Sequence, residues 1–314
     1  MYCVAIDLGG TFIKVGLIKN NELSDFRSIP AHRERFVDNI NSIEITINSL
    51  LYKWNVKMED LYGIGLAFPG MVNPLEKKVV STNSKYDDAV NVDFSSWVYD
   101  NWRTSFIIDN DARLAVVGEW KFGSGMKNRN MVMMTIGTGI GTGVVLDNRL
   151  INGSNYNAGS LGGHIIVDYR GRRCTCGNIG CVEAMASSFF LTDIIKCNLN
   201  LSNSFREKAI DYDFKKLFSL MQSGNRDAEI VCKECMDVWS AAIINYIYAY
   251  DPEVIVLGGG IMRSADIIIP YIEEKVHKLV WSSGDKVKIK PSLLGDNAAL
   301  FGISYLLKNQ NNEK

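Results

Sequence analysis

Two short glycine-rich segments of this 314-residue sequence have the composition of phosphate-binding turns. The first, DLGGT, places Gly9, Gly10 and Thr11 directly after an apolar run. Glycines let the main chain approach a ligand closely, and the N–H groups and the threonine hydroxyl can donate hydrogen bonds to phosphate oxygens. Asp7 precedes this turn, where its carboxylate can hold Mg²⁺ through water. The segment therefore predicts one part of a nucleotide phosphate site.

The second segment, TIGTGIGTG, offers the same chemistry through Gly137, Thr138 and Gly139. Either turn alone is explained more readily by an ordinary hairpin. Because two such turns occur at matching places in the two halves of the chain, binding of a polyphosphate is the better explanation for the pair. A third cluster follows the apolar run VIVL and comprises Gly258, Gly259 and Gly260. A nucleotide can lie against such a strand end, although a simple strand-to-helix turn explains the cluster equally well.

Neither of the two commoner nucleotide-binding motifs fits these turns. A Rossmann fingerprint requires G-x-G-x-x-G at the start of a helix, whereas the spacing here is G-x-G-x-G-x-G and the continuation VVLD reads as a strand. The P-loop pattern is absent from the sequence. DLGGT instead resembles the hairpin-type phosphate loop of the actin-like ATPase and sugar kinase fold.

Three polar side chains, Asp109, Asn110 and Asp111, lie where the predicted strand SFIID meets the predicted helix DARLAVVGEWKF. Asn110 and Asp111 occupy positions where such side chains normally cap free helix N–H groups. A phosphoryl-transfer enzyme also needs a base that orients and deprotonates the attacking hydroxyl, and this strand end is expected to point toward the phosphate turns. Asp111 is our candidate base, and Asp109, two residues earlier in the strand, is the second choice.

Three cysteines and one histidine have the spacing of a metal site. They form H-x9-C-x-C-x4-C and are His164, Cys174, Cys176 and Cys181. Small, turn-forming residues in CTCGNIGC let the thiolates converge, and four such ligands suit tetrahedral zinc. A complete set of four leaves no position for a water, so we expect the zinc to be structural. Cys232 and Cys235, one turn apart on an apolar helical segment, are expected in the core.

Strands and helices alternate along the chain. Residues 2–19 predict a β-hairpin, and residues 131–147 repeat it in kind, which suggests a duplicated α/β unit. A helical pattern covers residues 37–54, and IGLAFPG reads as a buried strand. Further on, a long helix precedes the strand EVIVLGGG, and the helix NAALFGISYLLKN closes the chain.

Composition places the protein among ordinary globular chains of about two domains. The hydrophobic fraction is 47%, and the 34 basic and 35 acidic residues leave a net charge of −1. This balance argues against a surface dominated by nucleic-acid binding. The apolar stretches fall short of the roughly 18 residues that a membrane span needs, and nothing in MYCVAIDLGG suggests secretion. We therefore expect no membrane partner, no nucleic-acid partner and a cytoplasmic location.

Together, DLGGTFIKVG, AFPGMV, NDARLAVVGE, TIGTGIGTG, GGH-x9-CTCGNIGCVEA and DPEVIVLGGG resemble the ROK family of sugar kinases and sugar-responsive repressors. The resemblance covers nearly the whole chain, and its zinc segment is the most specific part. It implies two actin-like (ribonuclease H-like) α/β domains with an interdomain cleft. We expect the first domain at residues 1–115 plus 300–314, and the second, with the zinc loop, at residues 116–299.

The resemblance also implies an ATP-dependent hexose kinase that uses Mg²⁺ and transfers the γ-phosphoryl group, most readily to a primary 6-OH. Asp111 would be the base and Asn110 would contact the sugar hydroxyls. His164 and Glu183 would hydrogen-bond the sugar near its anomeric end, while His164 also ligates zinc. Other expected site residues are Gly70 and Asn83 for the sugar and Lys14 for the nucleotide.

One departure from the family pattern concerns the sugar. Members often carry A-G-E-x-G-H, whereas this chain reads AGSLGGH, with Ser160 in the place of the glutamate and an extra glycine. A carboxylate contact to the sugar is therefore missing or replaced, which leaves the acceptor open between a glucose-type hexose, an N-acetylhexosamine and fructose. A catalytically silent sugar sensor is the other alternative. Repressor members carry a helix-turn-helix domain ahead of the first hairpin, and Tyr2 already belongs to that hairpin, so the kinase branch is favoured. A homodimer is what the resemblance suggests.

Overall fold

The computed structural model describes residues 1–82, 85–281, 284 and 286–312. The chain forms two compact units. Unit 1 comprises Met1–Met126, Leu150–Gly159 and Asn297–Lys314, and unit 2 comprises Lys127–Arg149 and Ser160–Asp296. The expected boundary after residue 115 falls inside helix α3 (Asp111–Phe122), which lies wholly in unit 1. The loop at residues 150–159 also belongs to unit 1, although we assigned it to the second domain.

Unit 1 is built on a five-stranded sheet with the order β3-β2-β1-β4-β7. Its strands are β1 (Tyr2–Leu8), β2 (Phe12–Lys19), β3 (Glu22–Pro30), β4 (Leu61–Phe68) and β7 (Phe106–Asn110). β1 and β2 form the predicted antiparallel hairpin, whereas β4 and β7 run parallel to β1 and to each other. The carboxyl ends of β1, β4 and β7 therefore meet at one edge of the sheet. A small hairpin, β5 (Gly70–Asn73) and β6 (Lys78–Thr82), follows β4.

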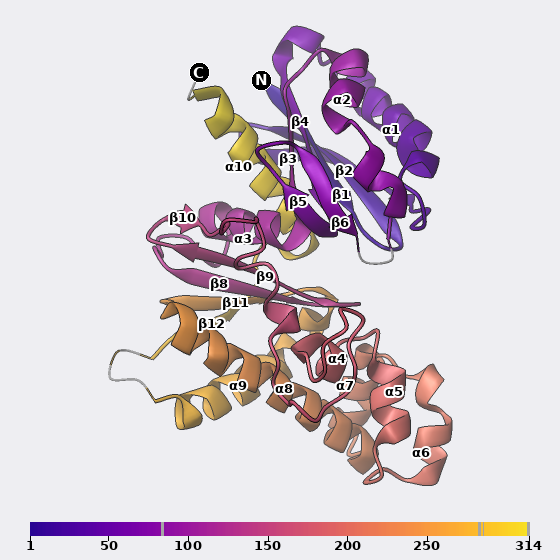
Figure 1. Ribbon diagram of the computed structural model, residues 1–314, viewed down its shortest axis with the longest axis vertical. Coiled ribbons are helices and arrows are strands. Elements are labelled where there is room, and N and C mark those ends of the chain that lie inside the picture. Colours follow the sequence, from indigo (N-terminus) through magenta and orange to yellow (C-terminus); the bar gives the residue numbers. More distant parts are fainter. Residues whose placement is uncertain (83–84, 282–283, 285, 313–314) are drawn as a thin grey trace. The chain divides into compact units, whose positions relative to one another are not determined.

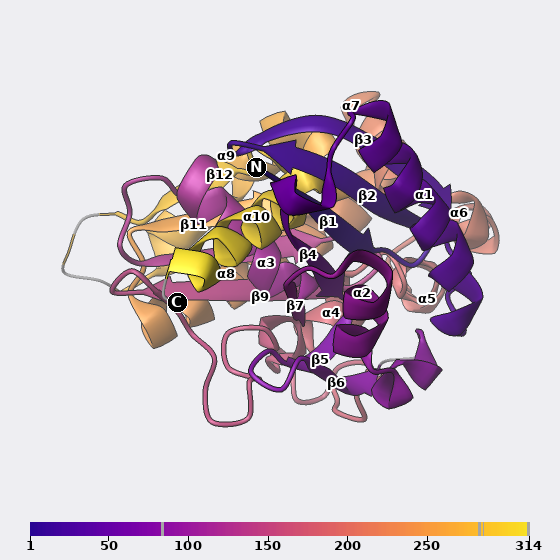
Figure 2. The same cartoon turned by 90° about the horizontal axis from the view of Figure 1, so that it is seen from above.

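Both faces of this sheet are covered by helices. On one face, α1 (Ile40–Lys53) and α2 (Phe94–Trp102) bury Val4, Ile6 and the alternate residues of the neighbouring strands in a single core. The other face carries α10 (Ala298–Asn312), so α1 and α10 lie on opposite sides of the sheet (Figures 1 and 2). Strands buried on both faces read as continuous apolar runs, which is why YCVAIDL and IGLAF were recognisable in the sequence.

Glycines bring α10 close to its neighbours. In the sheet, Gly16, Gly63 and Gly65 lie directly beneath leucine and isoleucine side chains of α10. Between the helices, a Cβ atom at Gly118 of α3 would overlap the backbone carbonyl of Ala298, and one at Gly302 would overlap that of Leu114. α3 and α10 therefore pack backbone against backbone.

Unit 2 repeats the plan of unit 1. Its five-stranded sheet has the order β10-β9-β8-β11-β12. The strands are β8 (Met131–Ile136), β9 (Ile140–Leu146), β10 (Arg149–Leu150), β11 (Val254–Gly258) and β12 (Lys288–Pro291). β8 and β9 form an antiparallel hairpin, and β11 and β12 continue the sheet in parallel. The equivalent strand order in both sheets supports the duplication that the two glycine hairpins predicted.

Helices of unit 2 position the segment with the four candidate metal ligands. They are α4 (Val182–Ala186), α5 (Leu191–Cys197), α6 (Asn203–Glu207), α7 (Phe214–Gln222), α8 (Arg226–Tyr250) and α9 (Ala265–Leu279). The long α8 buries Cys232 and Cys235, as expected for core residues. Its Trp239 indole donates to the Ala186 carbonyl, and its Tyr246 hydroxyl donates to the Gly162 carbonyl. These two bonds fix the segments on either side of the candidate metal ligands.

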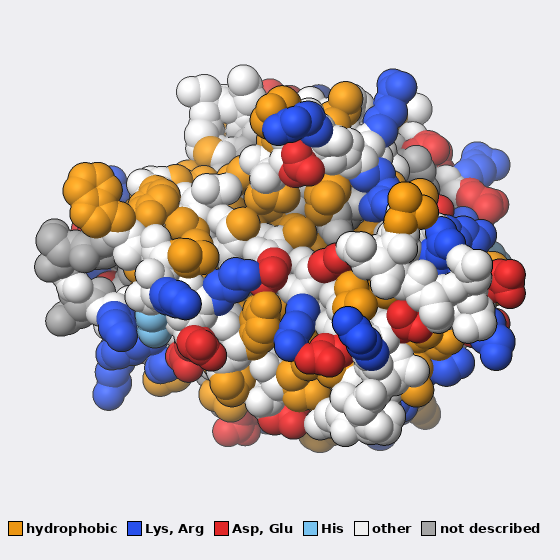
Figure 3. Space-filling view, turned by 90° about the horizontal axis from the view of Figure 1, so that it is seen from below, with side chains coloured by type: hydrophobic (Ala, Val, Ile, Leu, Met, Phe, Trp, Pro, Cys, Tyr) orange, Lys and Arg blue, Asp and Glu red, His pale blue; other side chains and the backbone are white. Residues whose placement is uncertain are grey.

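The described surface carries both signs of charge. On the face shown in Figure 3, basic and acidic side chains are interspersed, in keeping with the balanced composition. Among the described residues, every helix is either too short or too polar to cross a bilayer.

Candidate functional site

The first glycine turn joins β1 to β2 and is closed by its own backbone. The Gly9 N–H donates to the Phe12 carbonyl at 3.0 Å, and a Cβ atom at Gly9 would lie 2.5 Å from the same oxygen, so a side chain cannot fit there. Thr11 is exposed next to it. Asp7 and Lys14 are cross-strand partners just before and after the turn, and paired residues of neighbouring strands project from the same face. The predicted phosphate-binding residues of this segment therefore share one end of the hairpin.

Tyr86 and Lys85 also reach this turn, and neither was singled out in the sequence. The Tyr86 hydroxyl donates to the Gly9 carbonyl at 2.6 Å. Burial, followed by the nearby charge of Asp7, raises the pKa of Tyr86 to about 12. The Lys85 side chain lies over Gly10. The loop NSKYDD matches no motif, so only its folded position reveals these residues.

The strand end before α3 places its three polar side chains differently. Asn110 is the N-cap of α3: its Oδ1 accepts from the Arg113 N–H at 3.2 Å, and its Nδ2 donates to the Gly70 carbonyl at 3.1 Å. Asp111 is the first residue of the helix, and its Oδ1 accepts from the Ala112 N–H at 2.8 Å. The sequence allowed either Asn110 or Asp111 to cap α3, and in the structure the N-cap is Asn110. Gly70 is therefore held next to Asn110, and the Asp111 carboxylate is held against the first turn of α3.

Surrounding protein raises the pKa of Asp111. Desolvation is the main cause, and the N–H of Ala112 and the positive charge of Lys85 act against it. The residue as a whole is of intermediate exposure, whereas Asp109 is buried. A raised pKa makes an aspartate a stronger proton acceptor, which is what a general base requires.

Asp109 instead belongs to a buried ion pair. Its Oδ2 lies 3.4 Å from the Arg113 guanidinium, and the two side chains are 5% and 0% exposed. Burial raises the pKa of Asp109 to about 6, against the lowering effect of Arg113. Arg113 also donates to the Tyr156 carbonyl at 3.0 Å, which ties the loop at residues 150–159 to α3. The sealed position of Asp109 favours Asp111 as the base.

The second glycine turn is held by the segment that follows the cysteines. Glu183 accepts a hydrogen bond from the Ile140 N–H at 2.8 Å. A Cβ atom at Gly139 would collide with the same carboxylate oxygen, whereas one at Gly137 would meet nothing within 4 Å. The carbonyls of Gly137 and Thr138 accept from the N–H groups of residues 188 and 189. Gly139 therefore makes room for Glu183, and Gly137 faces open space.

The third glycine cluster closes the end of β11. Gly258 ends the strand, and Gly259 has a φ of 90° and lies against the Ile136 carbonyl. Gly260 begins a short 3₁₀ helix and has nothing within 4 Å of a built Cβ atom. Gly258 and Gly259 thus pack against the end of β8, which leads into the second glycine turn. Of the three glycines, only Gly260 has open space beside it.

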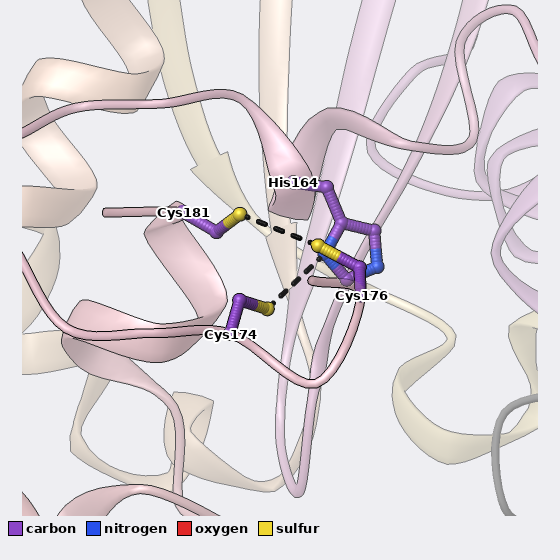
Figure 4. A group of neighbouring side chains, drawn as sticks. All are labelled: His164, Cys174, Cys176 and Cys181. Atoms are coloured by element: carbon purple, nitrogen blue, oxygen red, sulfur yellow. Dashed lines mark hydrogen bonds between the residues drawn. The ribbon is translucent and has the colours of Figure 1, made fainter. Parts of the chain in front are cut away.

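The four candidate metal ligands converge in unit 2 (Figure 4). Their ligand atoms all lie within 4.8 Å of one another. Cys174 Sγ is 3.6 Å from His164 Nδ1, and Cys176 Sγ is 3.6 Å from Cys181 Sγ. Ligand atoms on a tetrahedral zinc with bonds of about 2.3 Å are about 3.7 Å apart, close to the two 3.6 Å distances and about an ångström below the 4.8 Å limit of the set, so small side-chain shifts let this donor set bind zinc. All the cysteines of the cluster are free thiols rather than disulfides.

The chain context of these ligands keeps them together. His164 ends a short 3₁₀ turn, Cys181 directly precedes α4, and Ile166 forms an isolated β-bridge with Cys181. The Gly162 N–H donates to Thr142 Oγ1 on β9 at 2.8 Å. The metal segment is therefore attached to the strand that follows the second glycine turn.

The predicted site residues divide between the two units. Unit 1 contains Asp7, Gly9, Gly10, Thr11, Lys14, Gly70, Asn110 and Asp111. Unit 2 contains Gly137, Thr138, Gly139, His164, Glu183, the three cysteines of the cluster and Gly258, Gly259 and Gly260. Asn83 lies outside the described residues.

Comparison with known proteins agrees with these features. The sequence profile of the ROK family matches residues 3–310. The chain belongs to the ROK family. A glucokinase of Halalkalibacterium halodurans is 28% identical to this ROK protein over 98% of the chain and 96% of the relative. A xylose repressor of Bacillus spizizenii is 28% identical over 98% of the chain and 77% of the repressor.

The fold of this ROK protein is shared with solved structures. A ROK family glucokinase from Streptomyces griseus, in complex with glucose and AMPPNP, matches it with a TM-score of 0.83 at 21% identity. The match covers 98% of this chain and 100% of the other. The predicted actin-like α/β fold is thereby confirmed.

Proposed function

We propose that this ROK protein is an ATP-dependent sugar kinase that transfers the γ-phosphoryl group to the 6-OH of a glucose-type hexose. The observation that carries the proposal is the position of Asp111. Its carboxylate has a raised pKa and feels the charge of Lys85, whose side chain lies over Gly10 of the first glycine turn. The residue proposed as proton acceptor and the turn proposed to bind phosphate therefore belong to one unit, and each is influenced or contacted by Lys85.

The proposed reaction is an in-line displacement. Asp111 takes the proton of the sugar hydroxyl as its oxygen forms a bond to the γ-phosphorus. The bond from that phosphorus to the bridging oxygen breaks, and its electron pair leaves with ADP. In this proposal Gly9, Gly10 and Thr11 hold phosphate oxygens, and Gly137 and Thr138 are assigned the same kind of contact. Mg²⁺, when bound, neutralises phosphate charge, and Asp7 with its neighbour Lys14 is the pair placed to hold the magnesium–phosphate group.

The sugar-binding part of the proposal rests on side chains whose hydrogen bonds leave a group to spare. Asn110 is the exception: its Nδ2 donates to the Gly70 carbonyl and its side chain also hydrogen-bonds Asp111, so a sugar hydroxyl would replace one of these bonds. Glu183 uses one oxygen on Ile140 and keeps the second. His164 turns Nδ1 toward Cys174, so a metal bound there leaves an Nε2–H that can donate to a sugar oxygen.

Zinc completes this arrangement as a structural ion. His164, Cys174, Cys176 and Cys181 fill four tetrahedral positions and leave none for a substrate. Zinc binding would fix the tautomer and ring orientation of His164 and hold the start of α4, on which Glu183 lies. The proposal further includes a cytoplasmic homodimer, on the strength of the family resemblance.

A sugar sensor without catalysis is the second candidate. The similarity to a xylose repressor and the serine at position 160 favour it. A panel of glucose, mannose, fructose, xylose, N-acetylglucosamine and N-acetylmannosamine, tested for ADP formation and for binding by calorimetry, separates the two functions. ADP formation with one hexose that is abolished by Asp111→Asn supports the kinase. Binding of a sugar without ADP formation supports the sensor and overturns the kinase.

A further inference from the structure

Lys85 lies over the first glycine turn. A Cβ atom built at Gly10 would be 3.4 Å from Lys85 Cε and 3.6 Å from its Nζ. The end of the Lys85 side chain therefore lies where it would contact a side chain at position 10, and the glycine leaves the space between the ammonium group and the backbone open. That space is where a ligand held by the turn would lie, because glycine is what lets the backbone approach a phosphate.

The backbone next to Lys85 is fixed to the same turn. Tyr86 is fully buried and adopts a left-handed conformation with a φ of 56°. Its hydroxyl donates to the Gly9 carbonyl, and its N–H donates to the Arg33 carbonyl at 2.6 Å. Because Tyr86 is held at both its side chain and its backbone, the Cα of Lys85 cannot move away from the turn. The Lys85 side chain therefore starts from a backbone position that is fixed relative to the turn.

The charges around Lys85 are those of the proposed reaction. Its positive charge acts on Asp111, the proposed base, and the charge of Asp7 acts on the neighbouring Tyr86. Lys85 thus lies near both the first glycine turn and the carboxylate proposed to accept the proton. An ammonium between a nucleophile and a phosphate is suited to the negative charge that the transferring group carries.

We propose that Lys85 is a catalytic residue whose ammonium group donates a hydrogen bond to the transferring phosphoryl group at the Gly9–Gly10 turn. This inference rests on the proposed phosphate binding at that turn. Lys85 transfers no proton in this step: the hydroxyl proton goes to Asp111, the new bond forms between the sugar oxygen and phosphorus, and the electron pair leaves with ADP. A charge-assisted hydrogen bond of this kind strengthens as charge develops on the phosphoryl oxygens.

The kinetic test compares three variants. Lys85→Met removes the charge at nearly equal length, Lys85→Arg keeps it, and Lys57→Met removes an exposed lysine of the same unit that pairs only loosely with Glu59, at 3.6 Å. We expect Lys85→Met to lower kcat by about 100-fold, the usual effect of losing one transition-state donor. Lys85→Arg should recover at least a tenth of the activity, and Lys57→Met should stay within twofold. Melting temperatures identify any folding defect, in which case Lys85→Gln replaces the methionine variant.

A pH profile excludes an indirect effect through Asp111. If Lys85 served only to lower the pKa of Asp111, the loss of kcat in Lys85→Met would vanish at high pH, where Asp111 is ionised in both proteins. We expect the deficit to persist on the high-pH plateau. Recovery there, or a plateau kcat within threefold of the unsubstituted protein, overturns the proposal.

Nucleotide binding separates this inference from the proposed kinase activity. AMPPNP carries a γ-phosphoryl group and ADP does not, so the ratio of their dissociation constants reports contacts to that group. We expect Lys85→Met to weaken AMPPNP about tenfold and to leave ADP within twofold. This result would support Lys85 even if no sugar were phosphorylated, in which case the proposed function alone would fail. Equal AMPPNP affinities for the two proteins overturn the role of Lys85.

Discussion

The Glu183 carboxylate accepts a hydrogen bond from the Ile140 N–H at 2.8 Å, and this bond joins the cysteine-rich segment to the second glycine turn. Glu183 lies in the first turn of α4, two residues after the proposed zinc ligand Cys181. Any disturbance of the metal cluster that shifts α4 is therefore transmitted to the turn proposed to hold phosphate.

The two glycines of this turn are predicted to differ in their tolerance of a side chain. Gly139→Ala would push the Glu183 carboxylate off Ile140, whereas Gly137→Ala meets only open space. Loss of a hydrogen bond to a charged group costs about 1.5–3 kcal/mol, so Gly139→Ala should lower the free energy of unfolding by about that amount. Gly137→Ala should leave it within about 0.5 kcal/mol. Urea unfolding curves of the two variants measure the difference, and equal stability would contradict the assigned role of Gly139.

Substitution of the two aspartates that flank Asn110 should have different effects, one on activity and the other on stability. Asp111→Asn keeps an oxygen to accept from the Ala112 N–H but loses the base, so kcat should fall by about 10²–10⁴-fold with little loss of stability. Asp109→Asn leaves the buried Arg113 charge without its ion-pair partner and should lower the free energy of unfolding by about 3–5 kcal/mol. Steady-state kinetics and thermal unfolding of both proteins test the assignment. A stable, inactive Asp109→Asn together with an active Asp111→Asn would exchange the two roles.

The activity should fall on the acid side through the pKa of Asp111. Desolvation raises this pKa, so the carboxylate is protonated, and unable to accept the sugar proton, at a higher pH than an ordinary aspartate near 3.9. The acid limb of kcat/KM should therefore lie above that value. Rates measured from pH 4 to 8 with the nucleotide saturating at each pH locate the limb. Full activity down to pH 4 would exclude Asp111 as the base.

Metal analysis should find about one zinc ion per chain. Cys176→Ser removes one of the four ligands and should lower the melting temperature and weaken sugar binding, since His164 and Glu183 lose their support. Cys197→Ser is the matched control, because Cys197 is an exposed free thiol on α5 outside the cluster. A metal-free protein with unchanged sugar affinity would refute the zinc site.

Local patterns were enough to predict much of the scaffold. α3 occupies residues 111–122, the segment DARLAVVGEWKF, and the hairpins around both glycine turns form where β-branched runs flank glycines. The helix expected at residues 37–54 begins as a 3₁₀ turn at Val37–Asn39 and becomes α-helical at Ile40. These elements are buried, so their apolar periodicity is strong. The edge strand β3 was not predicted, because its sequence ELSDFRSIP is largely polar and partly exposed.

The site was predictable only where residue type and spacing carry the chemistry. The four metal ligands converge as expected because thiolates crowded into one short segment can reach a common point. We ranked Asp111 above Asp109 from their positions in the sequence. The sequence does not reveal the physical difference between them, which is that Asp109 is paired with the buried Arg113. Lys85 was missed altogether, since its place over Gly10 depends on the hydrogen bond between Tyr86 and Gly9, which are 77 positions apart.

The return of the last helix to unit 1 has a consequence for how the protein is made. Ribosomes synthesise a chain from its N-terminus to its C-terminus. The sheet face that carries Gly16, Gly63 and Gly65 therefore leaves the ribosome long before α10, which covers it, has been synthesised. Throughout translation of the intervening residues, this apolar face must wait uncovered or be shielded by a chaperone. Truncation before residue 298 should therefore yield aggregated nascent product and not a shortened native protein.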